Sequence, residues 1–127
     1  MTQEELNEII RKHALWLDGK EDGKCADLHS VDLRRLDLSH TNLQGADLGE
    51  ANLNGSNLRG SNLSEANLRW ANLIDADLRD AHLRDTDLIR ADLRWACLRG
   101  AKMYKDTMDE ASLTKRQRDS IIIVEDA

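Results

Sequence analysis

The chain of 127 residues contains no proline, no phenylalanine and only two cysteines. Cys25 and Cys97 lack the pattern of a disulfide framework, so we expect a reducing, cytoplasmic location. No apolar run approaches the roughly 20 residues that a membrane-spanning helix needs, and we therefore expect no membrane partner. The net charge of −6 disfavours direct binding of nucleic acid through phosphate contacts.

A period of five residues runs along most of the chain. The central positions of this repeat run from Leu28 to Leu113, and leucine occupies 16 of the 18. Met103 and Met108 hold the other two. The residue two before each centre is mostly small, and the residue one before is Asp or Asn in 13 of the 18 units. The unit therefore reads Ala-(Asp/Asn)-Leu-x-x over residues 26–115.

Neither regular secondary structure brings all of these leucines into one core. Five residues of α-helix turn by about 500°, so the leucines would drift around every side of a helix. On a flat strand, an odd step sends successive leucines to opposite faces. The period therefore predicts a chain that changes direction every five residues. Leucine and the small residue then point inward, and Asp or Asn stands at corners, where short polar side chains bond nearby backbone.

The repeated unit resembles the motif of the pentapeptide-repeat family, which centres on Leu or Phe with Ala two before and Asp or Asn one before. The resemblance covers 90 of the 127 residues. It implies an all-β solenoid, a right-handed quadrilateral parallel β-helix with one pentapeptide on each side and about 20 residues per coil. The repeat over residues 26–115 would then form about 4.5 coils, stacked about 4.8 Å apart.

The open ends of such a stack need caps, because they expose core side chains and backbone groups. Residues 1–25 are predicted to form an N-terminal amphipathic capping helix and a loop. Thr2 and Glu5 form a capping box, and Gly19 is a plausible end for a helix over residues 3–17. We expect an apolar stripe on this helix to cover the first coil. The stripe consists of Leu6, Ile9, Ile10, His13, Trp16 and Leu17.

The C-terminal end departs from the repeat. Asp106 stands where a small inward residue is expected, so we expect the last pentapeptides to be distorted and Asp106 to turn outward. Residues 116–127 are predicted to be a C-terminal cap or tail, with Thr114 capping a short helix over 115–120. A β-prone segment follows, and it either covers the last coil or pairs two copies into a homodimer, as the resemblance implies for dimeric members. Its residues are Ile121, Ile122, Ile123 and Val124.

No motif in the sequence indicates catalysis, a cofactor or a metal, and we expect none of these. Asp27, His29 and Ser30 contain acid, base and hydroxyl types, but neighbours in one turn rarely meet in the geometry of a triad. Cys25 and Cys97 are interpreted as structural. The histidines show no metal-ligand spacing. They are His13, which is interpreted as a packing residue, and His29, His40 and His82.

The surface holds the remaining candidates, because residues 20 apart should stack in columns. Trp70 and Trp95 occupy outward positions, and Arg90 lies one coil beyond Trp70, which permits a cation–π contact. Exposed tryptophans often anchor interfaces, so this surface is the best candidate for a partner, with local packing as the alternative. A second column is interpreted as a solvated face rather than as a strip that contacts anions. It contains Arg59, Arg79 and Arg99.

These features favour a non-catalytic scaffold that binds an unidentified protein partner. The alternative is a DNA-mimicking modulator of DNA gyrase, because some members of the family confer quinolone resistance in this way. The repeat over residues 26–115 carries 15 acidic and 12 basic residues, a net charge of only −3. Such a mild charge is a weak imitation of DNA, which carries one charge per roughly 1.7 Å.

Overall fold

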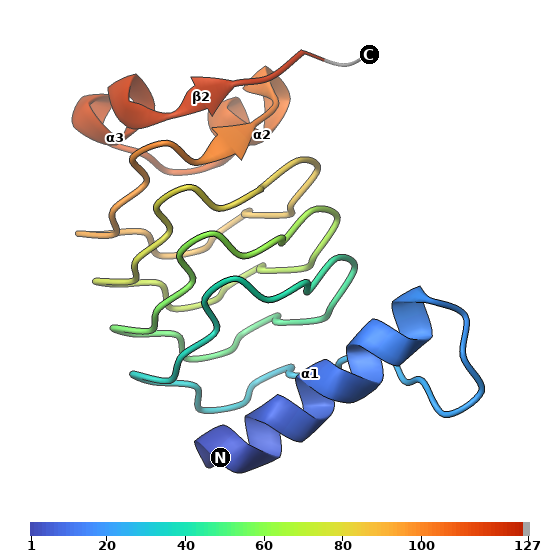
Figure 1. Ribbon diagram of the computed structural model, residues 1–127. Helices are drawn as coiled ribbons and strands as arrows, with labels where there is room; N and C mark the ends of the chain where they lie inside the picture. Colours follow the sequence, from blue (N-terminus) through green and yellow to red (C-terminus); the bar gives the residue numbers. More distant parts are fainter. Residues whose placement is uncertain (126–127) are drawn as a thin grey trace.

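The computed structural model describes residues 1–125 and shows a stack of coils between two caps (Figure 1). Helix α1 closes the N-terminal end, and α2, α3 and β2 gather at the other end. The elements are α1 (Gln3–Leu17), β1 (Lys102–Met103), α2 (Lys105–Glu110), α3 (Lys115–Ser120) and β2 (Ile122–Ile123). Within this described part, no helix is both long and apolar enough to cross a membrane.

Successive coils are joined by isolated parallel bridges between residues 20 apart, from Asp27 and Asp47 to His82 and Lys102. From Leu28 to Leu83, the amide of each central leucine donates to the carbonyl 19 residues later. From Asp47 to Asp92, the amide of each Asp or Asn that directly precedes a central leucine donates to the carbonyl 21 residues earlier. Because one unit has five residues and one bridge spans 20, four units make one coil. Each unit also turns, so the ladder consists of single bridges rather than long strands.

The leucines fill the interior of the stack. The fifteen from Leu28 to Leu98 are at most 2% exposed, and alanines such as Ala46 and Ala51 are fully buried beside them. The small side chains fit where the coil has little interior room. In the first coil, Val31 and Leu36 replace the small residue and lie partly buried against the core, as do Ile9 and Ile10 of α1. The repeat thus places one continuous core along the axis.

Helix α1 has the predicted bounds and the predicted capping box, in which Thr2 Oγ1 accepts from the Glu5 amide at 3.1 Å. The side chains of Leu6 and His13, which belong to this helix, are fully buried. Trp16 departs from the predicted stripe, because it stays 44% exposed and stacks on the His13 ring at a centroid distance of 5.4 Å, and Leu17 is only partly buried. The helix ends at Leu17, and Asp18 is its C-cap residue.

Side chains of α1 supply hydrogen bonds that a preceding coil would otherwise make. The Gln3 amide donates to the Asp37 carbonyl at 2.8 Å and accepts from the Asp37 amide at 2.9 Å, as an adjacent strand would. His13 Nδ1 accepts from the Ala26 amide at 2.9 Å, and its Nε2 lies 2.9 Å from the Gln44 carbonyl. Since Nδ1 is an acceptor, Nε2 carries the proton and donates to Gln44. The interpretation of His13 as a packing residue was therefore incomplete.

The coils end earlier than the predicted boundary at residue 115, because α2 stands where the repeat predicts a further pentapeptide. Asp106 is exposed, as expected, while Met108 of the same helix is buried. The physical reason is that a carboxylate in the small inward position would lose its water, whereas a helix turns it outward and keeps the methionine inside.

The last residues cover the final coil. Helix α3 has the predicted bounds, with Thr114 Oγ1 accepting from the Gln117 amide at 3.1 Å. The side-chain amide of Gln117 donates to the Leu93 carbonyl at 2.8 Å and to the Ala96 carbonyl at 3.1 Å. Strand β2 pairs in parallel with β1, so the segment from Ile121 to Val124 does cover the last coil.

Candidate functional site

The corners of the coils carry the outward-facing residues. Each corner residue is the last of its unit, and all fifteen from Ser30 to Gly100 have a positive φ, between 54° and 76°. The turn is closed by the next amide, as when Ala76 donates to the Leu73 carbonyl at 3.0 Å. A positive φ at the third residue is what a type II turn requires. Eleven of these corner residues are not glycine, and each tolerates a backbone that costs an L residue roughly 1 kcal/mol.

Two corners hold tryptophans, which are among the least suited side chains for this backbone. Trp70 is 59% exposed at a φ of 62°, and Trp95 is 83% exposed at a φ of 64°. They stand at neighbouring corners of consecutive coils, because 25 residues separate them. Arg90 occupies the corner one coil beyond Trp70, and its guanidinium carbon lies 5.3 Å from the centroid of that ring. The predicted cation–π contact is therefore confirmed. We call Trp70, Arg90 and Trp95 the tryptophan surface.

The predicted arginine column stands beside the corner that follows the corner of Trp95, because each of its arginines directly precedes a corner residue. Arg79 donates two hydrogen bonds to Asp77, at 2.9 and 2.7 Å. These bonds raise the pKa of Arg79 and lower the pKa of Asp77. Arg59 and Arg99 are exposed and have no ion pair within the described residues. One of the three guanidinium groups is thus already neutralised, which favours a solvated face.

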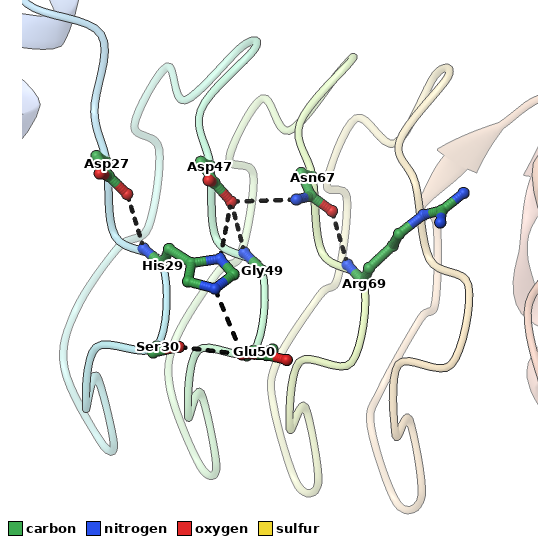
Figure 2. Close-up of polar contacts among 8 residues, drawn as sticks. All are labelled: Asp27, His29, Ser30, Asp47, Gly49, Glu50, Asn67 and Arg69. Atoms are coloured by element: carbon green, nitrogen blue, oxygen red, sulfur yellow. Dashed lines mark hydrogen bonds and ion pairs between the residues drawn. The ribbon is translucent and has the colours of Figure 1, made fainter.

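The turn that contains Asp27, His29 and Ser30 does not arrange its side chains for catalysis (Figure 2). The Ser30 hydroxyl donates to Glu50 at 3.2 Å rather than to the imidazole. His29 Nε2 lies 3.3 Å from the same Glu50 carboxylate, and its Nδ1 lies 3.6 Å from Asp47. The imidazole therefore links two acids of the next coil. A nucleophile needs the base to face its hydroxyl, and here the hydroxyl bonds to an acid.

Figure 2 also shows how the Asp and Asn positions hold the turns. The carboxylate of Asp47 accepts from the Gly49 amide two residues later at 2.9 Å and from the Asn67 side chain, one coil on, at 3.1 Å. A Cβ on Gly49 would lie 2.8 Å from His29 Nδ1, so this glycine makes room for the imidazole. The predicted bonding of the Asp and Asn side chains to nearby backbone is thus confirmed, but the predicted position at corners is wrong. These residues form the bridges between coils, and the turn follows two residues later, where their side chains accept from its amides.

A polar hollow of about 590 Å³ lies near the N-terminal end. Its wall includes Asp32, whose pKa falls to about 2 because of side-chain hydrogen bonds from Arg34. Sequence reasoning missed this hollow, although residues at intervals of 20 would have placed its polar wall on one side. The residues around it include Asp32, Arg34, Arg35, Asn52, Asn54 and Asn72.

The remaining titratable candidates are separate from one another. Cys25 and Cys97 are free thiols, and burial raises the pKa of Cys25. Over residues 1–125, no group of three or more His, Cys, Asp or Glu side chains has an arrangement that could hold a metal ion.

Comparisons with known proteins support this description. The family model described as pentapeptide repeats matches eight copies, over residues 26–65 and 66–103. A pentapeptide repeat protein from the thylakoid lumen of Arabidopsis thaliana is 27% identical, with a TM-score of 0.63, over 76% of this chain and 74% of that one. A pentapeptide repeat protein from Nostoc PCC 7120 is 28% identical, with a TM-score of 0.53, over 90% of this chain and 93% of that one. The comparison with curated proteins gave no match.

Proposed function

The chain belongs to the pentapeptide repeat family, and from this premise we propose that it is a non-catalytic module that docks another protein. The observation that carries the proposal is the exposure of Trp70 and Trp95 at neighbouring corners. Bulky residues rarely adopt a left-handed backbone, so tryptophan is an unusual side chain at corners that the repeat holds at a positive φ. Large aromatic side chains also supply most of the energy in many protein interfaces.

Affinity capture from the native host, followed by quantification of the retained proteins, tests the proposal. We expect Trp70→Ala and Trp95→Ala to leave the fold intact and to reduce capture of the same partner about tenfold or more. Glu65→Ala is a matched control, because Glu65 is an exposed corner residue with a φ of 62°. If both tryptophan variants retain every partner that the wild type captures, the proposal is wrong.

Imitation of DNA toward gyrase is the alternative, and the observation in its favour is the exposure of acidic residues at three successive corners around one coil, Asp75, Asp80 and Asp85. Against it, arginines neutralise other acids, as in the pair of Arg94 with Asp92 at 2.7 Å. A DNA-supercoiling assay separates the two functions. The docking module has no effect at micromolar concentration, and inhibition of gyrase there would favour the alternative.

We propose a homodimer through the C-terminal end as an additional assembly. Ile122 and Ile123 of β2 are each 49% exposed, and pairing with β1 occupies only one edge of the strand. An unpaired, apolar edge is suited to pairing with another chain. Light scattering at two concentrations tests this assembly, with Ile122→Lys as the variant that should remain monomeric. A monomeric wild type at high concentration would refute it.

The finer description of the fold and the location are also proposals. Parallel bridges at intervals of 20 and a turn in every unit support a right-handed quadrilateral β-helix, since parallel crossovers are almost always right-handed. Two free cysteines support the cytoplasm. A crystal structure and fractionation of the native host, respectively, would test these two statements.

A further inference from the structure

The contact between Trp70 and Arg90 indicates which kind of side chain a tryptophan at a corner of the stack can bind. Arg90 stands one coil beyond Trp70 at the same corner, and its guanidinium carbon lies 5.3 Å from the ring centroid. The backbone is in register there, because the Trp70 amide donates to the Ile89 carbonyl at 3.2 Å. A cation over the face of an indole ring is attracted by the ring quadrupole.

Trp95 has the same backbone conformation as Trp70, but no arginine occupies the next corner over its ring. The residue one coil beyond it in register is Lys115, which begins α3 instead of forming a corner. The Lys115 ammonium is paired with Asp119 at 2.9 Å. The indole of Trp95 is consequently 83% exposed, against 59% for Trp70. Because the coils end at this point, the place that Arg90 takes over Trp70 has no equivalent occupant over Trp95.

A carboxylate accompanies the uncovered ring. Asp75 is the corner residue one coil before Trp95, and the Asp75 amide donates to the Arg94 carbonyl at 3.1 Å. Asp75 is exposed and has no ion pair within the described residues. Arg94 does not compete for it, because its guanidinium is bidentate to Asp92, at 2.9 and 2.7 Å. An aromatic ring and an unpaired carboxylate at the same corner of adjacent coils form a combination that attracts a cationic side chain.

We propose that Trp95 and Asp75 together receive an arginine side chain from a basic segment of a partner protein. The inference rests on the proposed docking function and names the chemistry that the partner brings. Arginine fits better than lysine, because a planar guanidinium can stack on an aromatic face. The cation that lies over Trp70 is likewise an arginine, Arg90.

Titration of the ¹⁵N-labelled protein with a capped heptapeptide containing three arginines tests the proposal, with the indole N–H resonances as the readout. The control peptide carries citrulline in place of arginine. We expect the Trp95 resonance to shift in a saturable way with the arginine peptide alone. Asp75→Asn should weaken the affinity roughly two- to fivefold, the range for an exposed ion pair. No Trp95 shift, or an equal shift with citrulline, would overturn the proposal.

The second tryptophan provides an internal check. The Trp70 resonance should stay unchanged in the wild type, because Arg90 already covers the ring, and should respond to the peptide in Arg90→Ala. Lys115→Gln should leave the Trp95 resonance of the peptide-free protein in place. A shift there would mean that Lys115 already occupies the ring, and would contradict the proposal.

The two proposals fail in different experiments. If Trp95→Ala loses a captured partner while the Trp95 resonance ignores the arginine peptide, docking stands and the arginine chemistry is refuted. If the resonance responds but both tryptophan variants keep every partner, the site binds arginine and the proposed docking function is wrong.

Discussion

Replacement of His13 by leucine tests how the N-terminal cap is held. The imidazole is fully buried, accepts from the Ala26 amide and donates to the Gln44 carbonyl, both at 2.9 Å. Leucine keeps most of the apolar volume but leaves the two backbone groups without partners. Each buried group without a partner costs about 1–3 kcal/mol. We therefore expect His13→Leu to lower the free energy of unfolding by about 2–4 kcal/mol.

The same residue makes the stability depend on pH. Burial lowers the pKa of His13 from 6.5, against an opposing contribution from the hydrogen bond to Gln44. The folded state thus binds the proton less readily than the unfolded state. The stability contributed by neutral His13 is complete above pH 6.5 and is lost as the pH falls through the folded pKa. One proton changes the free energy of unfolding by at most about 1.4 kcal/mol per pH unit.

Urea denaturation at pH 7 and pH 5, followed by tryptophan fluorescence, measures both effects. Carboxylates whose pKa is lowered, such as Asp32 at about 2, titrate below this window. The wild type should lose stability between the two pH values, and His13→Leu should lose less. His82→Leu is the control, because the partly exposed His82 side chain has no hydrogen bond in the described structure. Equal pH dependence in the wild type and His13→Leu would refute the reasoning.

Three further substitutions test the packing, each measured by urea denaturation. Ser56 Oγ is buried without a hydrogen-bond partner, so Ser56→Ala should raise the free energy of unfolding by about 1 kcal/mol. Ser61→Ala is the control and should not raise it, because the Ser61 hydroxyl donates to a backbone carbonyl. A Cβ on Gly23 would collide with the backbone of Trp16, so Gly23→Ala should cost about 1–3 kcal/mol, and an unchanged stability would contradict the close approach. Gln117→Leu removes two hydrogen bonds to the last coil and should lower the free energy of unfolding by about 1–2 kcal/mol. Proteolysis of this variant should begin in α3, and protease resistance equal to that of the wild type would argue against the capping role.

Much of the fold could be predicted because the repeat ties every residue to one position in a coil. The period alone places Leu53 inside and Trp70 outside, and the 20-residue coil that the family resemblance implies places Arg90 over Trp70. The capping box of Thr2 also has a local signature, which explains why the bounds of α1 could be predicted.

The caps themselves could not be predicted in detail. His13 and Gln117 bond to backbone groups that lack partners only because the coils stop there, and no local pattern shows which groups those are. Asp106 signalled a break in the repeat, but helix α2 depends on the burial of Met108 against the last coil. The polar contacts of His29 could not be predicted either, because they depend on where the next coil places Asp47 and Glu50.

The division of a coil into four equal units constrains how such a chain can change length. Inserting one pentapeptide before Trp70 would leave each later unit inside the repeat, yet would rotate the tryptophan surface by a quarter of a turn relative to α1. Inserting a whole coil of 20 residues would restore the orientation and lengthen the stack by only about 4.8 Å. Duplications therefore either redirect this surface or move it outward along the axis, and the number of pentapeptides added decides which.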